Sequence, residues 1–362
     1  MQAPSELFRD KKLAREITKK IHDIAPSELV KLCHVCGTHE WTLTHSGIRS
    51  LLPDTVKLIA GPGCPVCIVP AREIDEAVWL AENDVTIVTF GDMFRDPGSE
   101  KSLEDAKSNG ADVRVVYSVL DALDLARNEP DREFVFFGIG FETTVPMNAV
   151  VLPESPGNLS FLMSHRVIPP GMEFLVNLED LNVNGFIAPG HVSTIIGEKA
   201  YEKFPKEYGV PTVVAGFEPL DMLMSVYMLL RQLHLREPKL ENEYTRAVSY
   251  QGNLKAQKVI DDTFDVVDGG WRGIGVIPDS MLQLKEKYSD KDARVKYDID
   301  VGPGRDIYPG CSCHMVIIGK IDPDQCPLFM KACTPERPKG ACMVSSEGTC
   351  RIWATHRYQE DL

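Results

Sequence analysis

The sequence predicts an α/β protein with two parallel-sheet domains and a small C-terminal domain organised by a metal centre. Short apolar runs recur over the first two thirds of the chain, and most end in glycine-containing turns. Helical patterns lie between these runs, which is the order of elements in α/β units. Six of the ten cysteines follow residue 310, where periodic patterning is weak, which suggests a bound metal centre there.

An amphipathic helix is expected near the N-terminus, because apolar residues recur there at helical spacing: Leu13, Ile17, Ile21 and Ile24. Seven apolar runs then predict buried strands of a parallel sheet, at residues 30–35, 56–60, 85–90, 113–117, 134–137, 186–188 and 212–215. Pro70 marks the start of a helix over residues 71–81. Ser118 and Asp121 form a capping-box signal ahead of a helix over residues 120–127.

About seven strand-turn-helix units exceed what one compact sheet of ~100 residues needs, so two α/β domains are favoured over one. We expect residues 1–128 to form the N-terminal helix and a first α/β domain with the CxxC motifs. Residues 129–240 are expected to form the second α/β domain, and residues 241–362 the C-terminal metal domain. The first boundary falls in the polar stretch 127–132, and the second in the charged segment 235–255.

The formal net charge of −14 offers no attraction to nucleic acid or anionic lipid, so neither is an expected partner. No uncharged apolar run reaches ~18 residues, and the polar first ten residues lack the apolar core of a secretory signal. A cytoplasmic protein without a membrane span is therefore expected. Cysteines are reduced in that compartment, so grouped thiols indicate metal or redox chemistry.

The C-terminal cysteines are Cys311, Cys313, Cys326, Cys333, Cys342 and Cys350. Structural zinc normally uses two tight cysteine pairs, and that pairing is absent here. An iron–sulfur cube accepts ligands from well-separated loop positions, so four of the six thiolates could enclose a [4Fe–4S] cluster. The alternative is that some of them are buried small apolar residues. Spacing alone does not select the four.

Two CxxC motifs, Cys33 to Cys36 and Cys64 to Cys67, each follow a predicted strand, where ligands bind in open α/β sheets. Cys67 precedes a predicted helix, so its thiolate is expected to face the helix N-terminus and to be acidic. Cys64 and Cys67 can then cycle between dithiol and disulfide. Alternatively the two pairs join in one zinc site, although their separation exceeds the usual gap.

Several polar residues near these turns could take part in the chemistry. His39 and Glu40 are possible ligands or proton carriers, and hydrogen-bonded structural roles are the alternative. The turn at residues 138–144 could aim Glu142 into the ligand-binding crevice at the carboxyl ends of the strands. The alternative is that these residues form a tight turn with a helix cap. His191 and Glu218 sit at corresponding strand ends, where they could orient a substrate, shuttle protons or cap helices. Residues 302–305 form a turn entering the metal domain.

Five motifs in order closely resemble the HypD family of hydrogenase maturation factors, over almost the whole length. They are Cys36-Gly37 with His39, and the segments 61–67, 140–144, 189–193 and 343–350. The resemblance implies two related parallel-sheet α/β domains plus a small C-terminal iron–sulfur domain. The family's cluster spacing, C-x12-C-x6-C-x16-C, selects Cys313, Cys326, Cys333 and Cys350 as [4Fe–4S] ligands. Cys311, Cys342 and Cys33 fall outside the pattern.

The resemblance also implies the chemistry. Cys36 resembles the family's iron-binding thiol, and Cys64 with Cys67 its redox pair, with His39, Glu142 and His191 as further candidates. Family members bind a small HypC-type chaperone and receive cyanide from a HypE-type donor. An Fe(CN)2(CO) unit is built on them before delivery to the large subunit of [NiFe]-hydrogenase. The chain is thus expected to be a maturation scaffold with thiol redox activity, rather than a conventional turnover enzyme.

The coexistence of a CPVC pair and a cluster suggests that electrons pass from the cluster to Cys64 and Cys67, similar to ferredoxin:thioredoxin reductase. The alternative function is a cluster-dependent thiol–disulfide oxidoreductase acting on an external protein disulfide. A third is a zinc-stabilised binding module. Infrared bands of CO and cyanide would favour the scaffold, and disulfide turnover independent of Cys36 would favour the oxidoreductase.

Overall fold

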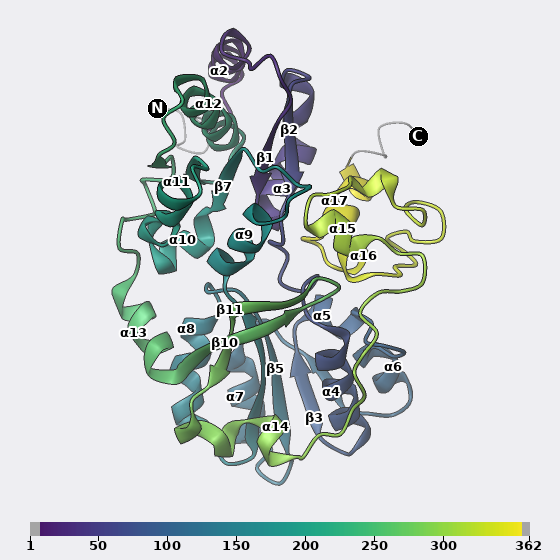
Figure 1. The fold of residues 1–362 in the computed structure, drawn as a ribbon. Helices are drawn as coiled ribbons and strands as arrows, with labels where there is room; N and C mark the ends of the chain where they lie inside the picture. The colour runs from purple at the N-terminus through teal and green to yellow at the C-terminus, as the bar shows by residue number, and fades with distance from the viewer. Residues whose placement is uncertain (1–7, 357–362) are drawn as a thin grey trace.

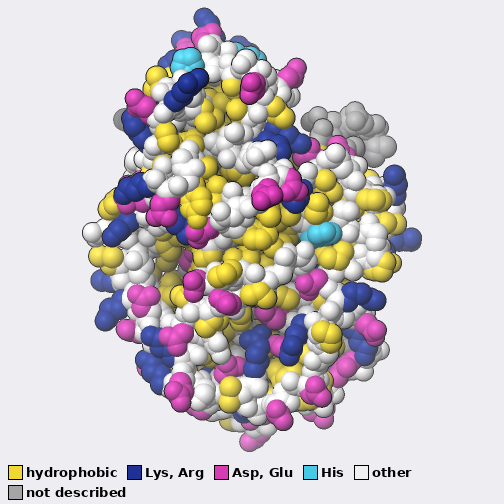
Figure 2. Space-filling view, in the orientation of Figure 1, with side chains coloured by type: hydrophobic (Ala, Val, Ile, Leu, Met, Phe, Trp, Pro, Cys, Tyr) yellow, Lys and Arg dark blue, Asp and Glu magenta, His cyan; other side chains and the backbone are white. Residues whose placement is uncertain are grey.

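The computed structural model describes residues 8–356, so residues 1–7 of the polar N-terminal segment, and residues 357–362, lie outside it. Two open sheets lie one above the other, and a cysteine-rich C-terminal region packs beside the upper one (Figure 1). On one face, hydrophobic side chains gather across the middle of the molecule and charged ones of both signs are interspersed around them (Figure 2).

The upper sheet, sheet A, is parallel throughout, with the strand order β2-β1-β7-β8-β9. Its strands are β1 (Val30–His34), β2 (Val56–Ala60), β7 (Gly185–Pro189), β8 (Thr212–Ala215) and β9 (Leu240–Asn242). The helical elements of this part are α2 (Lys11–Asp23), α3 (Gly37–His45), η1 (Ile48–Leu51), α10 (Gly190–Ile196), η3 (Glu198–Tyr201), α11 (Lys203–Glu207) and α12 (Pro219–Leu235). The expected N-terminal helix is α2, which buries Ile17 and Ile21.

The lower sheet, sheet B, has the order β10-β11-β6-β5-β3-β4; β11 pairs antiparallel with both β10 and β6, and the other pairings are parallel. Its strands are β3 (Thr86–Thr89), β4 (Val113–Val115), β5 (Phe134–Gly140), β6 (Leu159–Arg166), β10 (Phe264–Trp271) and β11 (Gly275–Leu284). The helical elements here are α4 (Ala71–Glu82), α5 (Gly91–Arg95), α6 (Leu103–Ser108), α7 (Val119–Asn128), α8 (Val145–Val151), η2 (Leu152–Glu154), α9 (Ile168–Val176), α13 (Leu254–Thr263), η4 (Glu286–Lys291) and α14 (Ala293–Lys296).

The cysteine-rich region contains short elements only: α15 (Cys313–Ile317), η5 (Pro323–Gln325), α16 (Ala341–Val344) and α17 (Thr349–His356). Its cysteines belong to the same hydrophobic core as Cys64, Cys67 and the strands around them. The region is therefore held against both sheets by apolar packing.

All seven predicted strand runs contain a strand, and the helices predicted over residues 71–81 and 120–127 form as α4 and α7. The capping box of Ser118 and Asp121 is present at the start of α7. The prediction of an α/β protein is thus confirmed, with one sheet wholly parallel and the other mainly parallel.

The predicted boundaries differ from the division between the sheets. Residues 30–60 join sheet A, whereas residues 86–115 from the same predicted domain join sheet B. The polar stretch at residues 127–132 links α7 to β5 within the lower part. Residues 264–284, expected in the metal domain, complete sheet B as a hairpin. The boundaries were wrong because the chain crosses between the sheets more than once, and hydrophobic periodicity does not report strand pairing.

Candidate functional site

Cys36 lies in the loop that follows β1 and is the N-cap residue of α3. Burial and the nearby Glu347 carboxylate raise the pKa of its thiol to about 11. Hydrogen bonds from the backbone N–H groups of His39 and Thr38, and from the Thr38 hydroxyl, act in the opposite direction. Cys36 is therefore a neutral thiol near pH 7, with donors already directed at its sulfur to stabilise the thiolate once a metal displaces the proton.

Two glycines hold the loop after β2 against the loop after β1. The N–H of Gly61 donates to the His34 carbonyl oxygen at 2.7 Å. A Cβ atom on Gly63 would lie 2.2 Å from the backbone nitrogen of Cys36, which no side chain can do without displacing the backbone. The residue that precedes Cys64 thus packs directly on Cys36, and the two loops form one site.

Cys64 and Cys67 are joined by a disulfide, and both are buried. The N–H of Cys67 donates to the Cys64 sulfur at 3.2 Å. The first N–H of α4, at Ala71, donates to the Asp306 carboxylate at 2.8 Å, so a carboxylate occupies that donor at the N-terminus of the helix that Cys67 was expected to face. The alternative of one zinc site is disfavoured, because two of its four thiols are joined to each other.

His39 and His191 approach the site from α3 and α10 and differ in burial. His39 is fully buried and its Nε2 donates to the Gly216 carbonyl oxygen at 3.0 Å. Burial lowers the pKa of His39 to about 3, so the ring is neutral and its Nδ1 is left as a buried acceptor without a hydrogen bond. His191 is exposed and stacks on Phe217 at 3.8 Å.

Glu142, which was expected to be aimed into the crevice, is buried. Its Oε1 accepts a hydrogen bond from the N–H of Ile168 at 2.9 Å, and its Oε2 has no hydrogen-bond partner. Burial raises the pKa of Glu142 to about 7. Tyr201, which sequence analysis missed, lies within electrostatic range of both Glu142 and Cys36 and is hydrogen-bonded to Ser193 at 3.2 Å. This chain of groups links the loop after β5 to the site on sheet A.

Glu40 is engaged in a buried network and is neither a free ligand nor a free proton carrier. Its carboxylate accepts hydrogen bonds from four side chains: His34, Thr44, Arg49 and Trp353. Burial opposes its ionisation, but the Arg49 guanidinium and His34 hold the pKa of Glu40 well below its ordinary value. The role of Glu218 is likewise structural, because it caps α12 through a capping box with Asp221.

Five C-terminal cysteines line one small cavity with Phe329, Gly340 and Met343: Cys311, Cys313, Cys326, Cys333 and Cys350. A Cβ atom at residue 340 would lie 2.9 Å from the Cys311 sulfur, so glycine allows the thiols to converge. Cys342 does not line the cavity; its sulfur accepts a hydrogen bond from the N–H of Cys350 at 3.2 Å. Buried soft thiols around a cavity are a donor set that fits an iron–sulfur cluster. Among residues 8–356, no three or more His, Cys, Asp or Glu side chains converge closely enough to bind a single metal ion, whereas a cluster of several irons takes its ligands from more widely spaced positions.

Comparison with known proteins identifies the family. The family model HypD, described as "Hydrogenase formation hypA family", matches residues 12–357. The chain belongs to the HypD family. It is 46% identical over 355 residues to a hydrogenase expression/formation protein of Methanocaldococcus jannaschii, covering 97% of this chain and 99% of that protein. It is 43% identical over 368 residues to hydrogenase maturation factor HypD2 of Bradyrhizobium diazoefficiens, covering 98% and 97%. With HypD of Escherichia coli the identity is 42% over 365 residues, covering 99% and 97%.

The HypD motifs that lie far apart in the sequence meet at one place in this structure. Gly37 packs against Glu347, since a Cβ at residue 37 would lie 2.6 Å from the Glu347 Cβ. Asp92 accepts hydrogen bonds from the N–H and the hydroxyl of Ser346, both at 2.8 Å, and so ties this C-terminal segment to the lower part of the molecule. Asp92 lies just after the predicted strand run 85–90, and this position at a strand end is the sequence signal that could have identified it. In the described residues, no helix has the length and apolar character needed to cross a membrane.

Proposed function

We propose that this HypD protein is the scaffold on which an Fe(CN)2(CO) unit is assembled for [NiFe]-hydrogenase, with Cys36 as the thiol that binds the iron. The observation that carries the proposal is the packing of the Cys36 loop on the loop that holds Cys64 and Cys67. Of the eight cysteines outside the disulfide, all within the described residues, seven are buried and Cys36 is only partly buried. A metal-binding thiol beside a redox-active pair suits iron that must be bound in a defined oxidation state.

The residues around Cys36 supply the environment for the bound iron unit. Low-spin iron with cyanide and CO is a soft centre that thiolate binds well. The Thr38 and His39 donors stabilise the thiolate, and neutral His39 holds the first turn of α3 by its bond to Gly216. Glu142, whose pKa of about 7 lets it gain or lose a proton near neutral pH, is the proton-carrying group proposed for the far side of the site.

Cys313, Cys326, Cys333 and Cys350 are proposed to hold a [4Fe–4S] cluster, which would supply one-electron chemistry at this end of the molecule. The cavity adds Cys311 as a fifth thiol, hydrogen-bonded to Cys313, which lowers the pKa of Cys311 to about 6. The cluster spacing of the family favours the quartet, and Cys311 is then a neighbour of the cluster. The cytoplasm is the proposed location.

A groove beside Cys36 suits the proposed HypC-type partner. It has a volume of about 1190 Å³ and begins at Thr38, two residues from Cys36. Its apolar walls include Trp41, Ile48, Leu51, Phe217, Leu220 and Leu223, and cations of α2 line its rim at Lys11, Arg15 and Lys19. A small partner with an apolar, acidic segment would thereby reach the iron-binding thiol. The HypE-type cyanide donor and the hydrogenase large subunit are proposed to act on this assembly in turn.

Anaerobic co-purification with a HypC-type partner, followed by infrared spectroscopy, tests this function. The complex should show CO and cyanide stretching bands, which Cys36→Ser should abolish. Cys64→Ala should leave the cluster absorption intact and abolish maturation. Bands that persist in Cys36→Ser, or full maturation with Cys64→Ala, would contradict the assigned roles. The burial of both disulfide sulfurs disfavours the alternative of exchange with an external protein disulfide.

A further inference from the structure

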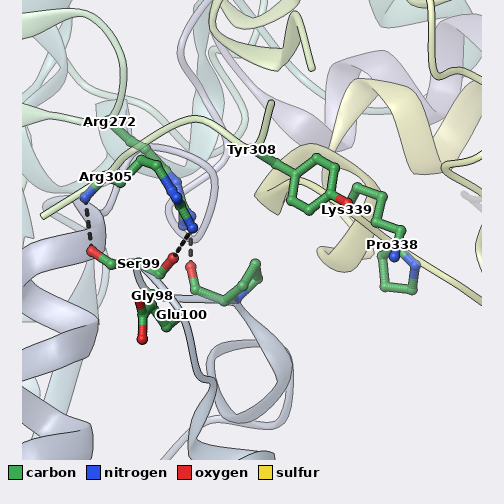
Figure 3. A pocket seen from close by; sticks show the side chains of 9 residues that line it. Gly98, Ser99, Glu100, Arg272, Arg305, Tyr308, Pro338 and Lys339 are labelled. Atoms are coloured by element: carbon green, nitrogen blue, oxygen red, sulfur yellow. Dashed lines mark hydrogen bonds between the residues drawn. The ribbon is translucent and has the colours of Figure 1, made fainter. Parts of the chain in front are cut away.

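A second pocket, of about 200 Å³, lies against the outer side of the cysteine cavity. Its lining includes three cations, Arg272, Arg305 and Lys339, together with Tyr308, Pro338 and Glu100. Figure 3 shows Arg272 and Arg305 side by side, with Lys339 and Tyr308 across the pocket from them. The turn at residues 302–305 contributes one wall, so it does more than lead into the cysteine-rich region.

The pocket and the cysteine cavity share a wall one residue thick. The backbone N–H of Lys339 donates to the Cys333 sulfur at 3.3 Å, while the Lys339 side chain lines the pocket. The next residue, Gly340, packs on the sulfurs of Cys311 and Cys313. A group bound in the pocket therefore lies beside the residues that pack on the proposed cluster ligands.

The cationic wall is built rigidly. The buried Arg272 side chain donates to the carboxylate of Asp96 at 2.8 Å and to the carbonyl oxygens of Asp306 and Pro97 at 2.9 and 2.6 Å. Arg305 is tied to Ser99 by its backbone N–H, at 2.7 Å to the hydroxyl, and by its guanidinium, at 2.8 Å to the carbonyl oxygen. These contacts fix the guanidinium groups before any ligand arrives, which lowers the entropic cost of binding.

The two more exposed cations of the pocket are free to bind an anion. Neither Arg305 nor Lys339 forms an ion pair with another described residue, and the Lys339 ammonium lies 5.5 Å from the Tyr308 ring centroid. Glu100 is the one carboxylate in the lining. Because the chain as a whole carries a formal charge of −14, an acidic protein is repelled by most of it and would be oriented toward such a local cationic site.

We propose that this pocket is the docking site of an acidic one-electron carrier protein, whose surface carboxylates bind between Arg305 and Lys339. The proposal rests on the proposed function, in which Cys64 and Cys67 are a redox-active pair, and it adds that their disulfide is reduced by electrons from outside the chain. Breaking its S–S bond and forming two thiols takes two electrons and two protons. The reduced carrier supplies one electron in each of two encounters and is oxidised, and solvent supplies the protons.

The test uses the full-length protein, purified anaerobically with its iron, and a plant-type [2Fe–2S] ferredoxin as the acidic probe. Binding is measured by calorimetry at ~0.05 M and ~0.3 M NaCl, since screening should weaken a charge-steered complex. We expect the double variant Arg305→Gln/Lys339→Gln to weaken binding by about tenfold or more at low salt. The matched control Lys258→Gln/Lys287→Gln removes the same charge on α13 and η4, and its dissociation constant should stay within about twofold of the wild type.

The single variant Lys339→Gln shows whether weaker binding could result from misfolding, because it keeps the backbone N–H that binds Cys333. Its iron content should match that of the wild type, and its affinity for ferredoxin should fall. Absence of ferredoxin binding by the wild type, equal binding by the double variant, or an equal loss in the control would each overturn the proposal. A maturation assay driven by a chemical reductant separates failure of the docking site from failure of the proposed function. The double variant should still support maturation in this assay. Maturation by Cys36→Ser would instead contradict the proposed function.

Discussion

The indole Nε1 of Trp353 donates a hydrogen bond of 2.8 Å to the Oε1 of Glu40. Trp353 lies on α17 three residues after Cys350, and Glu40 lies on α3 four residues after Cys36. Both side chains are buried. This bond therefore joins the helix that carries a proposed cluster ligand to the helix that follows Cys36, and so connects the two proposed metal sites directly.

Loss of this bond should loosen the connection without unfolding the protein. We expect Trp353→Phe to lower the free energy of unfolding by about 1–3 kcal/mol, because a buried carboxylate oxygen loses a donor while Arg49 and His34 remain. Urea unfolding monitored by circular dichroism measures the change. Trp41→Phe, at a side chain that is 40% exposed, is the control and should change the stability by less than about 1 kcal/mol. Equal effects at both positions would contradict the assigned role.

A methyl group at residue 63 should disrupt the site more than the fold. Gly63→Ala places a Cβ against the backbone of Val35 and Cys36, and we expect a loss of about 1–3 kcal/mol and a displaced Cys36 loop. Hydrogenase maturation should fall while the iron content of the protein is retained. Gly157→Ala is the matched control, because its Cβ would meet no atom within 4 Å. Normal maturation by Gly63→Ala would show that the close packing of the two loops is not needed.

Sequence patterns predicted seven of the strands in the described residues and missed β6, β9, β10 and β11. All of β5 is buried, and its apolar residues 134–137 were recognised directly. β6 is equally buried but contains Ser160, Ser164, His165 and Arg166, so its polar residues concealed it. β1 pairs with β7, which lies about 150 residues further along the chain, and nothing in the local sequence specifies that partner.

The candidate site was predictable where reactive residues directly follow neighbouring strands of one sheet. Cys36 and Cys64 follow neighbouring parallel strands, so their loops had to meet at one sheet edge. Tyr201 and Trp353 gave no such signal, because a buried aromatic residue looks the same in sequence whether it fills the core or donates a hydrogen bond. Their contacts, to Ser193 and Glu40, depend on how the tertiary structure brings these segments together.

The cavity lining separates the C-terminal cysteines into two groups. We expect Cys333→Ser to lose most of the bound iron and inorganic sulfide, because it removes one of the proposed cluster ligands. Cys342→Ser should retain both, since its sulfur faces the N–H of Cys350 and a hydroxyl can accept the same bond. Iron and sulfide analysis after anaerobic purification measures the difference. A Cys342→Ser protein without iron, beside a Cys333→Ser protein with it, would reverse the assignment.

Glu142 should make the stability of the protein depend on pH. Its pKa is raised by burial from an ordinary value of 4.5 to about 7 in the folded state, so the folded protein binds this proton more tightly than the unfolded chain. The stabilisation is complete below about pH 4.5 and is lost as the pH rises through about 7, by up to about 3 kcal/mol. Glu142→Gln keeps a neutral side chain at every pH and should remove this component.

The measurement is the difference in unfolding free energy between the wild type and Glu142→Gln, from urea titrations at about pH 5 and about pH 8. Other titrating groups are common to both proteins, so they cancel in the difference unless they contact Glu142; Tyr201, the nearby phenol, stays neutral over this range because burial raises its pKa. Relative to wild type, the variant should gain stability on going to the higher pH. A difference that does not change with pH would mean that Glu142 reaches solvent and ionises freely, and it would then be unsuited to hold a proton at the far side of the site.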